Sequence, residues 1–196
     1  MDFIGTLSLA MGSAWVSGIN LYATVATLGL LGRFSGLQLP GELGVLTNWW
    51  VIGIAGGLYA IEFVADKVPY IDSTWDLIHT FIRVPAGAAL AATAFGDFDK
   101  GVQVVALLLG GGIALSSHGA KTATRAAINT SPEPVSNIAM SLVEDVVAVG
   151  AILLSVFVPI LMIIVVAVFF VTAIIFLPRI IRLLRRLIAR IRGQAA

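Results

Sequence analysis

The chain has 196 residues, of which 59% are hydrophobic and only 12% are charged, with a net charge of +1 at pH 7. A soluble domain carries about 25% charged residues, so a chain this apolar cannot cover its surface with polar groups, and lipid is its expected solvent. Cysteine is absent, which excludes disulfides, thiol catalysis and cysteine metal sites. Because the apolar runs are long and continuous, they predict an all-α, polytopic membrane bundle of about six transmembrane helices rather than a barrel.

Six apolar segments, joined by polar or Gly/Pro-rich links, predict the helices. They cover residues 3–31, 49–65, 75–95, 102–118, 131–157 and 160–177. The first carries Gly12, Gly18 and Asn20 near its middle, where we expect a bend or a break in the helix. The third is expected to begin with a capping box formed by Ser73 and Asp76.

The distribution of basic residues predicts the orientation. Residues 1–178 form the predicted transmembrane domain, and residues 179–196 form a basic, amphipathic tail that we expect to lie on anionic lipid. Six arginines in this tail place the C-terminus in the cytoplasm by the positive-inside rule, and six crossings return the N-terminus to the same side. Five or seven spans stay open as alternatives. Lys67, and Lys121 and Arg125 of the link expected after the fourth helix, then face the cytoplasm.

Ionisable residues recur inside the predicted spans, where each costs roughly 2.5–3.5 kcal/mol to insert and therefore requires a partner or a function. On the third helix, Asp76, His79 and Arg83 form one polar stripe, and we expect Arg83 to meet Glu144 of the fifth helix. A purely structural interpretation stays open, in which these charges are ion pairs that hold helices together. The candidate substrate- or ion-binding residues are Arg83, Glu144, Asp145, Glu62, Asp66, Asp76, His79, Asn137 and Asn20, with His118, Lys121 and Arg125 on the cytoplasmic side.

Residues 49–97 and 102–157 form a candidate internal repeat of two helical hairpins. When the two hairpins are aligned, Asp66 lies opposite Lys121. Arg83 and Glu144, the expected ion pair, also occupy equivalent positions in the two hairpins. Chance similarity between apolar helices is the alternative explanation. Repeats of this kind build many transporter folds, with the binding site between the repeats.

No sequence motif indicates a cofactor. Two histidines on different helices and scattered carboxylates do not make a metal site, and the sequence has no Walker loop, dinucleotide fingerprint or Ser-His-Asp spacing. We therefore expect no catalytic residue, metal or cofactor, and no nucleic-acid partner, because lipid explains the amphipathic tail better. Glycine-rich faces would permit a homo-oligomer.

Five polar strings of the sequence are distinctive. They are Gly18–Thr24 (GINLYAT), Glu62–Pro69 (EFVADKVP), Asp72–Arg83 (DSTWDLIHTFIR), Ser131–Asn137 (SPEPVSN) and the pair Glu144–Asp145. They resemble a bacterial family of small membrane proteins, domain of unknown function 4126, over most of residues 15–150. The resemblance implies a multi-pass protein of the bacterial inner membrane and implies no activity.

The leading hypothesis is a transporter or permeation protein for a small anionic or proton-coupled solute. It rests on the density of ionisable residues on helices two to five and on two helix starts whose dipoles point inward. Arg83 would bind an anion or gate against Glu144, while the acids of helices two and three would handle protons or cations. The alternative is a non-transporting scaffold that binds lipid or a partner protein. A third is a membrane enzyme acting on lipid headgroups with His79 or His118 as base, which lacks a recognisable nucleophile.

Overall fold

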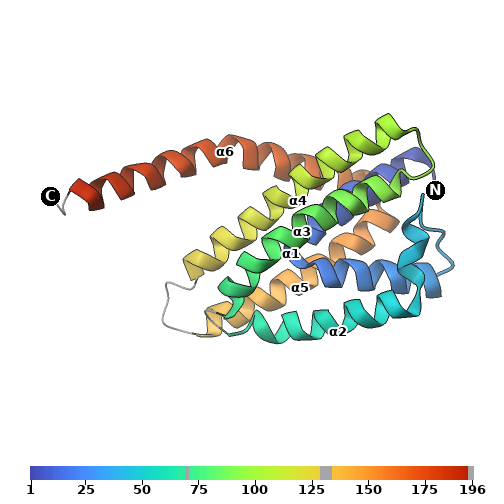
Figure 1. Ribbon diagram of the computed structural model, residues 1–196, viewed down its shortest axis with the longest axis horizontal. Coiled ribbons are helices and arrows are strands. Elements are labelled where there is room, and N and C mark those ends of the chain that lie inside the picture. Colours follow the sequence, from blue (N-terminus) through green and yellow to red (C-terminus); the bar gives the residue numbers. More distant parts are fainter. Residues whose placement is uncertain (69–70, 129–133, 194–196) are drawn as a thin grey trace.

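The computed structural model describes residues 1–68, 71–128 and 134–193, and over these ranges the fold consists of helices without strands (Figure 1). In chain order the elements are α1 (Phe3–Phe34), the 3₁₀ segment η1 (Leu43–Thr47), α2 (Trp49–Ala65), α3 (Ile71–Ala94), α4 (Lys100–Ile128), α5 (Pro134–Phe157) and α6 (Pro159–Gly193). Five of the six α-helices in these ranges are long and apolar enough to cross a membrane, and α2 is a shorter apolar helix of 17 residues. The predicted all-α, polytopic class is confirmed.

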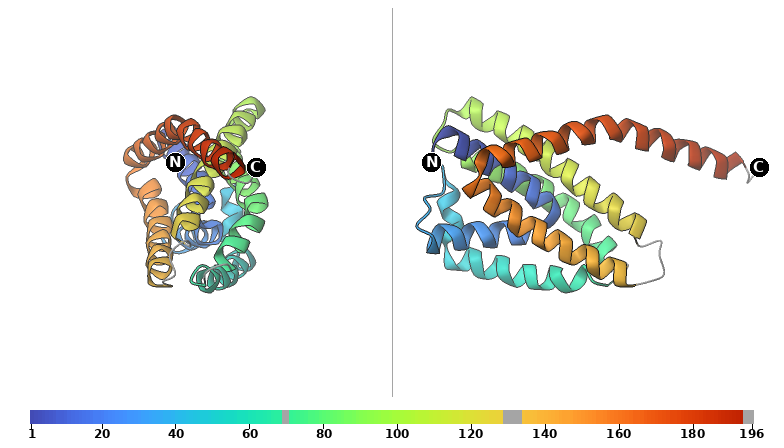
Figure 2. Two further views of the ribbon diagram at one scale, coloured as in Figure 1. Left: turned by 90° about the vertical axis from the view of Figure 1, so that its left-hand side faces the viewer. Right: turned by 180° about the vertical axis from the view of Figure 1, so that it is seen from behind.

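α1 is not one straight helix, because it folds back on itself at Asn20. That residue has the non-helical dihedral angles φ −148° and ψ 98°, and both halves of α1 run to the same end of the bundle (Figures 1 and 2). At this end, which we call the amino end, the Phe3 ring lies 6.2 Å from the Phe95 ring, and the Glu42 N–H donates to the Thr93 carbonyl at 3.0 Å. The predicted bend or break is confirmed, and it takes the form of a re-entrant helix buried in protein, where irregular backbone is tolerated at membrane depth.

Helices α2 to α6 pass between the amino end and the opposite end, which we call the carboxyl end. They make five passes within the described ranges, so the N-terminus and the end of α6 lie at opposite ends of the molecule (Figures 1 and 2). The prediction of six crossings, with both termini on one side, counted α1 as a crossing. The fold-back at Asn20 returns the second half of α1 to the amino end, although α1 is one of the five candidate spans by length and composition.

α1 is the most enclosed of the candidate spans. Of its apolar window 61% is buried, against 11–39% for the other four spans found in the described residues. A Cβ atom at Gly18 would collide with the Ser117 side chain and the Ala114 carbonyl of α4. Gly18 therefore lets the first half of α1 lie directly against α4 just before the break.

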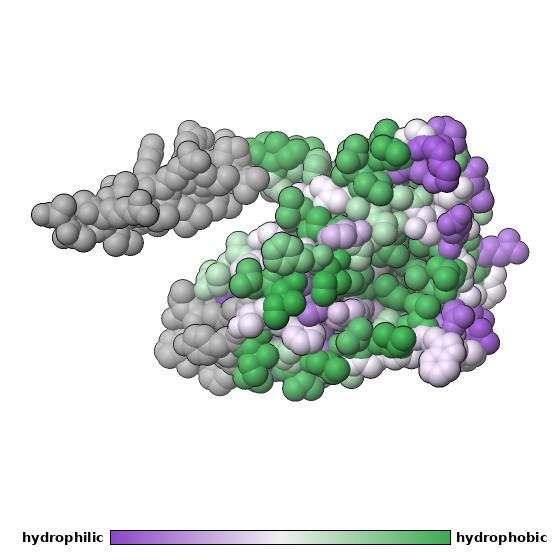
Figure 3. All heavy atoms as spheres, in the orientation of Figure 1, coloured by the Kyte–Doolittle hydropathy of each residue, from purple (hydrophilic) through white to green (hydrophobic). Residues whose placement is uncertain are grey.

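The polarity of the bundle is inverted relative to a soluble protein. Arg83 has no exposed surface, whereas Phe81, two positions earlier on α3, is 80% exposed, and Leu108 and Val146 also face outward. Hydrophobic residues cover much of the visible side, and hydrophilic residues gather at the amino end (Figure 3). Exposed apolar side chains around buried charges are what a lipid solvent requires.

Two helix boundaries differ from the predicted ones and change the place of charged residues. α3 begins at Ile71, so Ser73 and Asp76 lie within the helix, and the capping box predicted for its start is wrong. α4 continues past the predicted end of the fourth helix, so Lys121 and Arg125 are buried helical residues rather than link residues. Their charges are neutralised by acids on other helices. A hydropathy pattern along one helix cannot predict such neutralisation, because it contains no information about neighbouring helices.

α6 continues as one helix from the last span into the tail, to Gly193. The side chains from residue 177 onward lie outside the described ones, so the amphipathic face of the tail stays a prediction. The predicted helix start at Ser131–Pro132 also lies outside the described residues.

Candidate functional site

Seven charged side chains of the described residues meet inside the bundle, and none of them is more than 6% exposed. This charge network consists of Glu62 and Asp66 at the end of α2, Asp76 and Arg83 of α3, Lys121 and Arg125 of α4, and Glu144 of α5. On the first three elements, the two members are spaced by four or seven positions, so both side chains point the same way. The network thus joins four helices.

Arg83 is held by two carboxylates. Its guanidinium donates to Glu62 Oε1 at 2.5 Å and to Asp76 Oδ1 at 2.9 Å. The predicted ion pair between Arg83 and Glu144 is wrong, because Glu144 pairs with Arg125 instead. Arg83 therefore ties α3 to α2 rather than to α5.

Arg125 closes the network towards the carboxyl end. It donates two hydrogen bonds to the Glu144 carboxylate, one of 3.1 Å from Nε and one of 2.6 Å from a terminal nitrogen. Its other terminal nitrogen donates to Asn137 Oδ1 at 2.5 Å and to the Asp66 carbonyl at 3.2 Å. A paired, two-point contact of this kind fixes both side chains in one geometry.

Lys121 lies at the centre, surrounded by oxygen atoms from α1, α3, α5 and the end of α2. Its Nζ lies 3.0 Å from Asp66 Oδ2, 3.1 Å from the Ile19 carbonyl, 3.5 Å from both Asp76 Oδ1 and Glu144 Oε2, and 3.8 Å from Glu62 Oε1. The predicted opposition of Asp66 and Lys121 matches this contact. The internal repeat that suggested it stays a prediction.

The network contains four carboxylates and three cations within the described residues. One oxygen each of Glu62, Asp66 and Asp76 has no hydrogen-bond partner there. An unsatisfied buried oxygen costs about 1–3 kcal/mol. Each of these oxygens is therefore a place where water, a proton or an ion would be stabilised.

The break in α1 brings two helix ends to the network. At the end of the first half, the Ile19 carbonyl accepts from Lys121, and the Gly18 carbonyl lies 3.2 Å from His118 Nδ1. At the start of the second half, Asn20 caps the helix through its Oδ1 and donates through Nδ2 to Asp145 at 3.2 Å. The negative end of one half thus faces a cation, and the positive end of the other lies near a carboxylate, as helix dipoles favour.

The two histidines flank the network on separate sides. His79 Nε2 lies 3.0 Å from the Tyr22 hydroxyl, and His79 Nδ1 lies 2.8 Å from the Trp75 carbonyl. His118 Nε2 lies 2.7 Å from the Thr80 hydroxyl. Neither histidine hydrogen-bonds to a carboxylate among the described residues, where no group of three or more histidine and acidic side chains is arranged to hold a metal ion.

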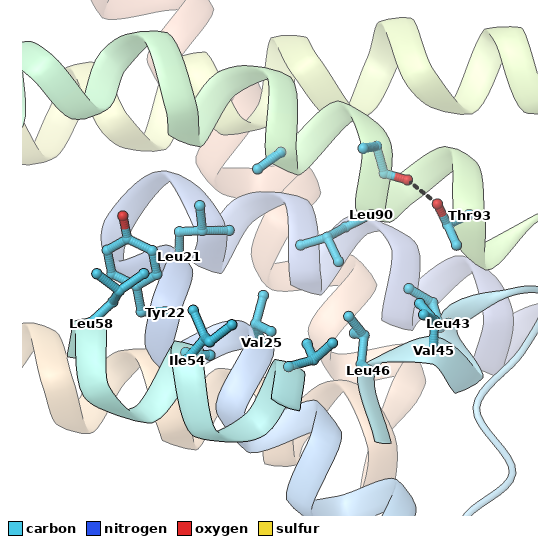
Figure 4. Close-up of a pocket in the computed structure, with 14 residues that line it drawn as sticks. Leu21, Tyr22, Val25, Leu43, Val45, Leu46, Ile54, Leu58, Leu90 and Thr93 are labelled. Carbon is cyan, nitrogen blue, oxygen red and sulfur yellow. Dashed lines mark hydrogen bonds between the residues drawn. The ribbon is translucent and has the colours of Figure 1, made fainter. Parts of the chain in front are cut away.

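Two cavities approach these residues. One, of about 460 Å³, is lined by apolar side chains of α1, η1, α2 and α3, and reaches the polar region only at Tyr22 (Figure 4). The other, of about 200 Å³, lies between α1, α4, α5 and α6, and has Lys121 and Glu144 in its wall beside apolar residues such as Trp15 and Phe169. The second cavity therefore leads to the charge network.

A family model described as Domain of unknown function (DUF4126) matches residues 7–179. The chain belongs to this family. The resemblance found in the polar strings is confirmed, and the matched region of this DUF4126 chain contains the whole charge network and the break in α1. No curated protein and no solved structure matches the chain.

Every residue proposed from the sequence lies in or beside the charge network of this DUF4126 protein. Sequence reasoning missed the Ile19 carbonyl, Tyr22 and Lys67. Lys67, in the turn after α2, donates to the Phe63 carbonyl at 2.8 Å and to Ser141 Oγ at 3.2 Å, and burial lowers the pKa of its ammonium. A backbone carbonyl carries no sequence signal, but a break next to Gly18 could have indicated that one is freed there.

Proposed function

We propose that this DUF4126 protein is a transporter or permeation protein for a small solute, coupled to protons, with the charge network as its polar site. The observation that carries the proposal is the meeting of buried charges with the interrupted helix α1. Interrupted helices whose ends face charged groups near mid-membrane build ion and substrate sites in many transporters. The two helix ends within α1, rather than the two helix starts expected from the sequence, direct dipoles at the network.

Of the two solute classes that the sequence suggests, the proton-coupled one fits the network better than the anionic one. Arg83, Lys121 and Arg125 each contact a carboxylate already, so within the described residues the network offers an anion only one unpartnered cationic nitrogen, Arg83 Nε, against three unpartnered carboxylate oxygens. Carboxylates outnumber cations there, and a surplus of close acids is relieved by taking up a proton. Proton uptake or release would then shift the ion pairs between alternative partners.

The proposed location is the inner membrane of a bacterium, with the carboxyl end of the bundle in the cytoplasm. The tail arginines and Lys67 lie in the segments assigned to that side, while Asp97 and Asp99 lie in the turn at the amino end. This distribution follows the positive-inside rule. With five passes, the N-terminus lies outside, which revises the earlier expectation that it is cytoplasmic.

The test is proton flux into liposomes that contain the purified protein and an internal pH-sensitive dye, with candidate solutes added in turn. We expect flux above that of empty liposomes, and a loss of about tenfold or more in Arg83→Ala, because removing a buried charge partner disrupts the network. Arg33→Ala is the matched control, since Arg33 is exposed at the amino end of the bundle. Absence of proton or solute flux in the wild-type protein would contradict the proposal.

The second candidate is a non-transporting scaffold that binds lipid or a partner protein. It is favoured by one observation: each cation of the network bridges different helices, as pairs that only hold a bundle together would do. A scaffold would lose stability in charge variants while showing no flux in the wild type. Co-purification of a stoichiometric protein or lipid would support it.

A further inference from the structure

The ammonium of Lys121 fills a cage built from five oxygen atoms. The cage consists of the Ile19 carbonyl and one oxygen each from Asp66, Asp76, Glu144 and Glu62, at 3.0–3.8 Å from Nζ. No other side chain of the described residues is bound by so many acids. Lys121 thus occupies the position that a free cation would take.

The dimensions of the cage select the class of ion. Mg²⁺ requires ligands at about 2.0–2.1 Å and Ca²⁺ at about 2.3–2.6 Å, which is closer than any oxygen lies to the cage centre. Ammonium-type hydrogen bonds of about 2.7–3.2 Å match the two nearest oxygens. No group of three or more acidic or histidine side chains in the described residues is arranged to hold a metal ion. A cation that binds through N–H hydrogen bonds, such as NH₄⁺, is therefore the fitting occupant.

The charges of the cage favour a cation even without Lys121. Arg83 and Arg125 neutralise two of the four carboxylates, which leaves two negative charges around the position of Nζ. The end of the first half of α1 adds the negative end of a helix dipole through the Ile19 carbonyl.

Two features bear on how an incoming cation would be accommodated. The second carboxylate oxygens of Glu62, Asp66 and Asp76, which are not the cage oxygens, have no hydrogen-bond partner among the described residues, so each of these acids, at least 97% buried, can offer an incoming cation another ligand. The cavity of about 200 Å³ borders Lys121 and Glu144, and gives the long, flexible lysine side chain a space outside the cage.

We propose that Lys121 is a tethered cation, which free ammonium, NH₄⁺, displaces from the oxygen cage. Displaced Lys121 enters a cavity with mostly apolar walls, where its charged form is costly, and it releases one proton to water. One cation gained and one proton lost leave the charge of the network unchanged. This inference rests on the proposed function, because it names the solute that exchanges for protons.

The test is ammonium binding by the detergent-solubilised protein, measured by calorimetry with NH₄Cl against N-methylglucamine chloride at constant ionic strength. We expect the wild type to release about one proton per bound cation into a weakly buffered dye solution. Lys121→Ala should bind the same cation about tenfold or more tightly, because it lacks the competing ammonium, and should release no proton on binding. Lys100→Ala, which alters an exposed lysine at the amino end, should behave as the wild type.

Wild-type protein that does not bind NH₄⁺ and releases no proton would overturn the inference, and this readout holds even if Lys121→Ala does not fold. Equal affinity in the wild type and Lys121→Ala would also overturn it. The binding experiment and the liposome flux experiment can fail independently of each other. Proton flux in liposomes without cation binding would leave the function standing with another solute, whereas cation binding without flux would leave the site standing and remove the function.

Discussion

Breaking the contact between Arg125 and Glu144 should reveal how strongly the charge network depends on complete pairing. In Arg125→Met the Glu144 carboxylate loses hydrogen bonds of 2.6 and 3.1 Å and keeps only Lys121, at 3.5 Å, within salt-bridge distance among the described residues. Removing one partner of a buried pair costs about 3–5 kcal/mol, because the remaining charge is left uncompensated. We expect a loss of this size in the free energy of unfolding.

The same pair allows a double-mutant cycle. Glu144→Gln alone should also destabilise the protein, but the double variant should cost about 1–3 kcal/mol less than the sum of the single variants, because it removes both charges. The assay is reversible unfolding in mixed micelles, with Arg33→Met as a control that changes an exposed arginine. The reasoning that this pair is buried and coupled would be refuted if the losses in the free energy of unfolding were additive. It would also be refuted if Arg125→Met lowered that free energy by less than about 1 kcal/mol.

Three further predictions concern α1 and the topology. Gly18→Ala should destabilise the protein by about 1–3 kcal/mol through its clash with α4, whereas Gly53→Ala, with no atom within 4 Å of the added Cβ, should be neutral or stabilising in a thermal melt. Asn20→Ala should cost about 0.5–2 kcal/mol through loss of the cap on the second half of α1; an unchanged melting temperature would contradict that role. The chain has no cysteine, so single variants Asp99→Cys and Gly193→Cys can be labelled without background. A membrane-impermeant maleimide added to intact cells should label the first and not the second, and labelling of both or of the second alone would contradict the orientation.

The local part of the site could be predicted from the sequence. The polar stripe that contains Asp76 and Arg83 follows from helical spacing alone, and the structure places both side chains in one ion pair. The choice of partner on another helix could not be predicted in the same way. Arg83 meets Glu62 rather than Glu144 because the fold brings the end of α2 to Arg83, and spacing within one helix does not contain that information.

Two features of the fold show a similar limit. Glycines and Asn20 indicated an interruption in the first helix, but not that the second half returns to the amino end, which depends on the dihedral angles of one residue. Lys121 and Arg125 looked like link residues because they are charged and lie in a polar stretch. They are helical because acids from α2, α3 and α5 compensate them, and such compensation becomes visible only in three dimensions.

The most direct test of the central claim, that the charge network handles protons, is the rate of proton entry into liposomes carrying either Glu62→Gln or Glu42→Gln. Glu62 is fully buried and bonded to Arg83, whereas Glu42 is exposed at the amino end. The account predicts wild-type rates for Glu42→Gln and a rate reduced about tenfold or more for Glu62→Gln in protein that unfolds as cooperatively as the wild type. Equal rates in the two folded variants would contradict it.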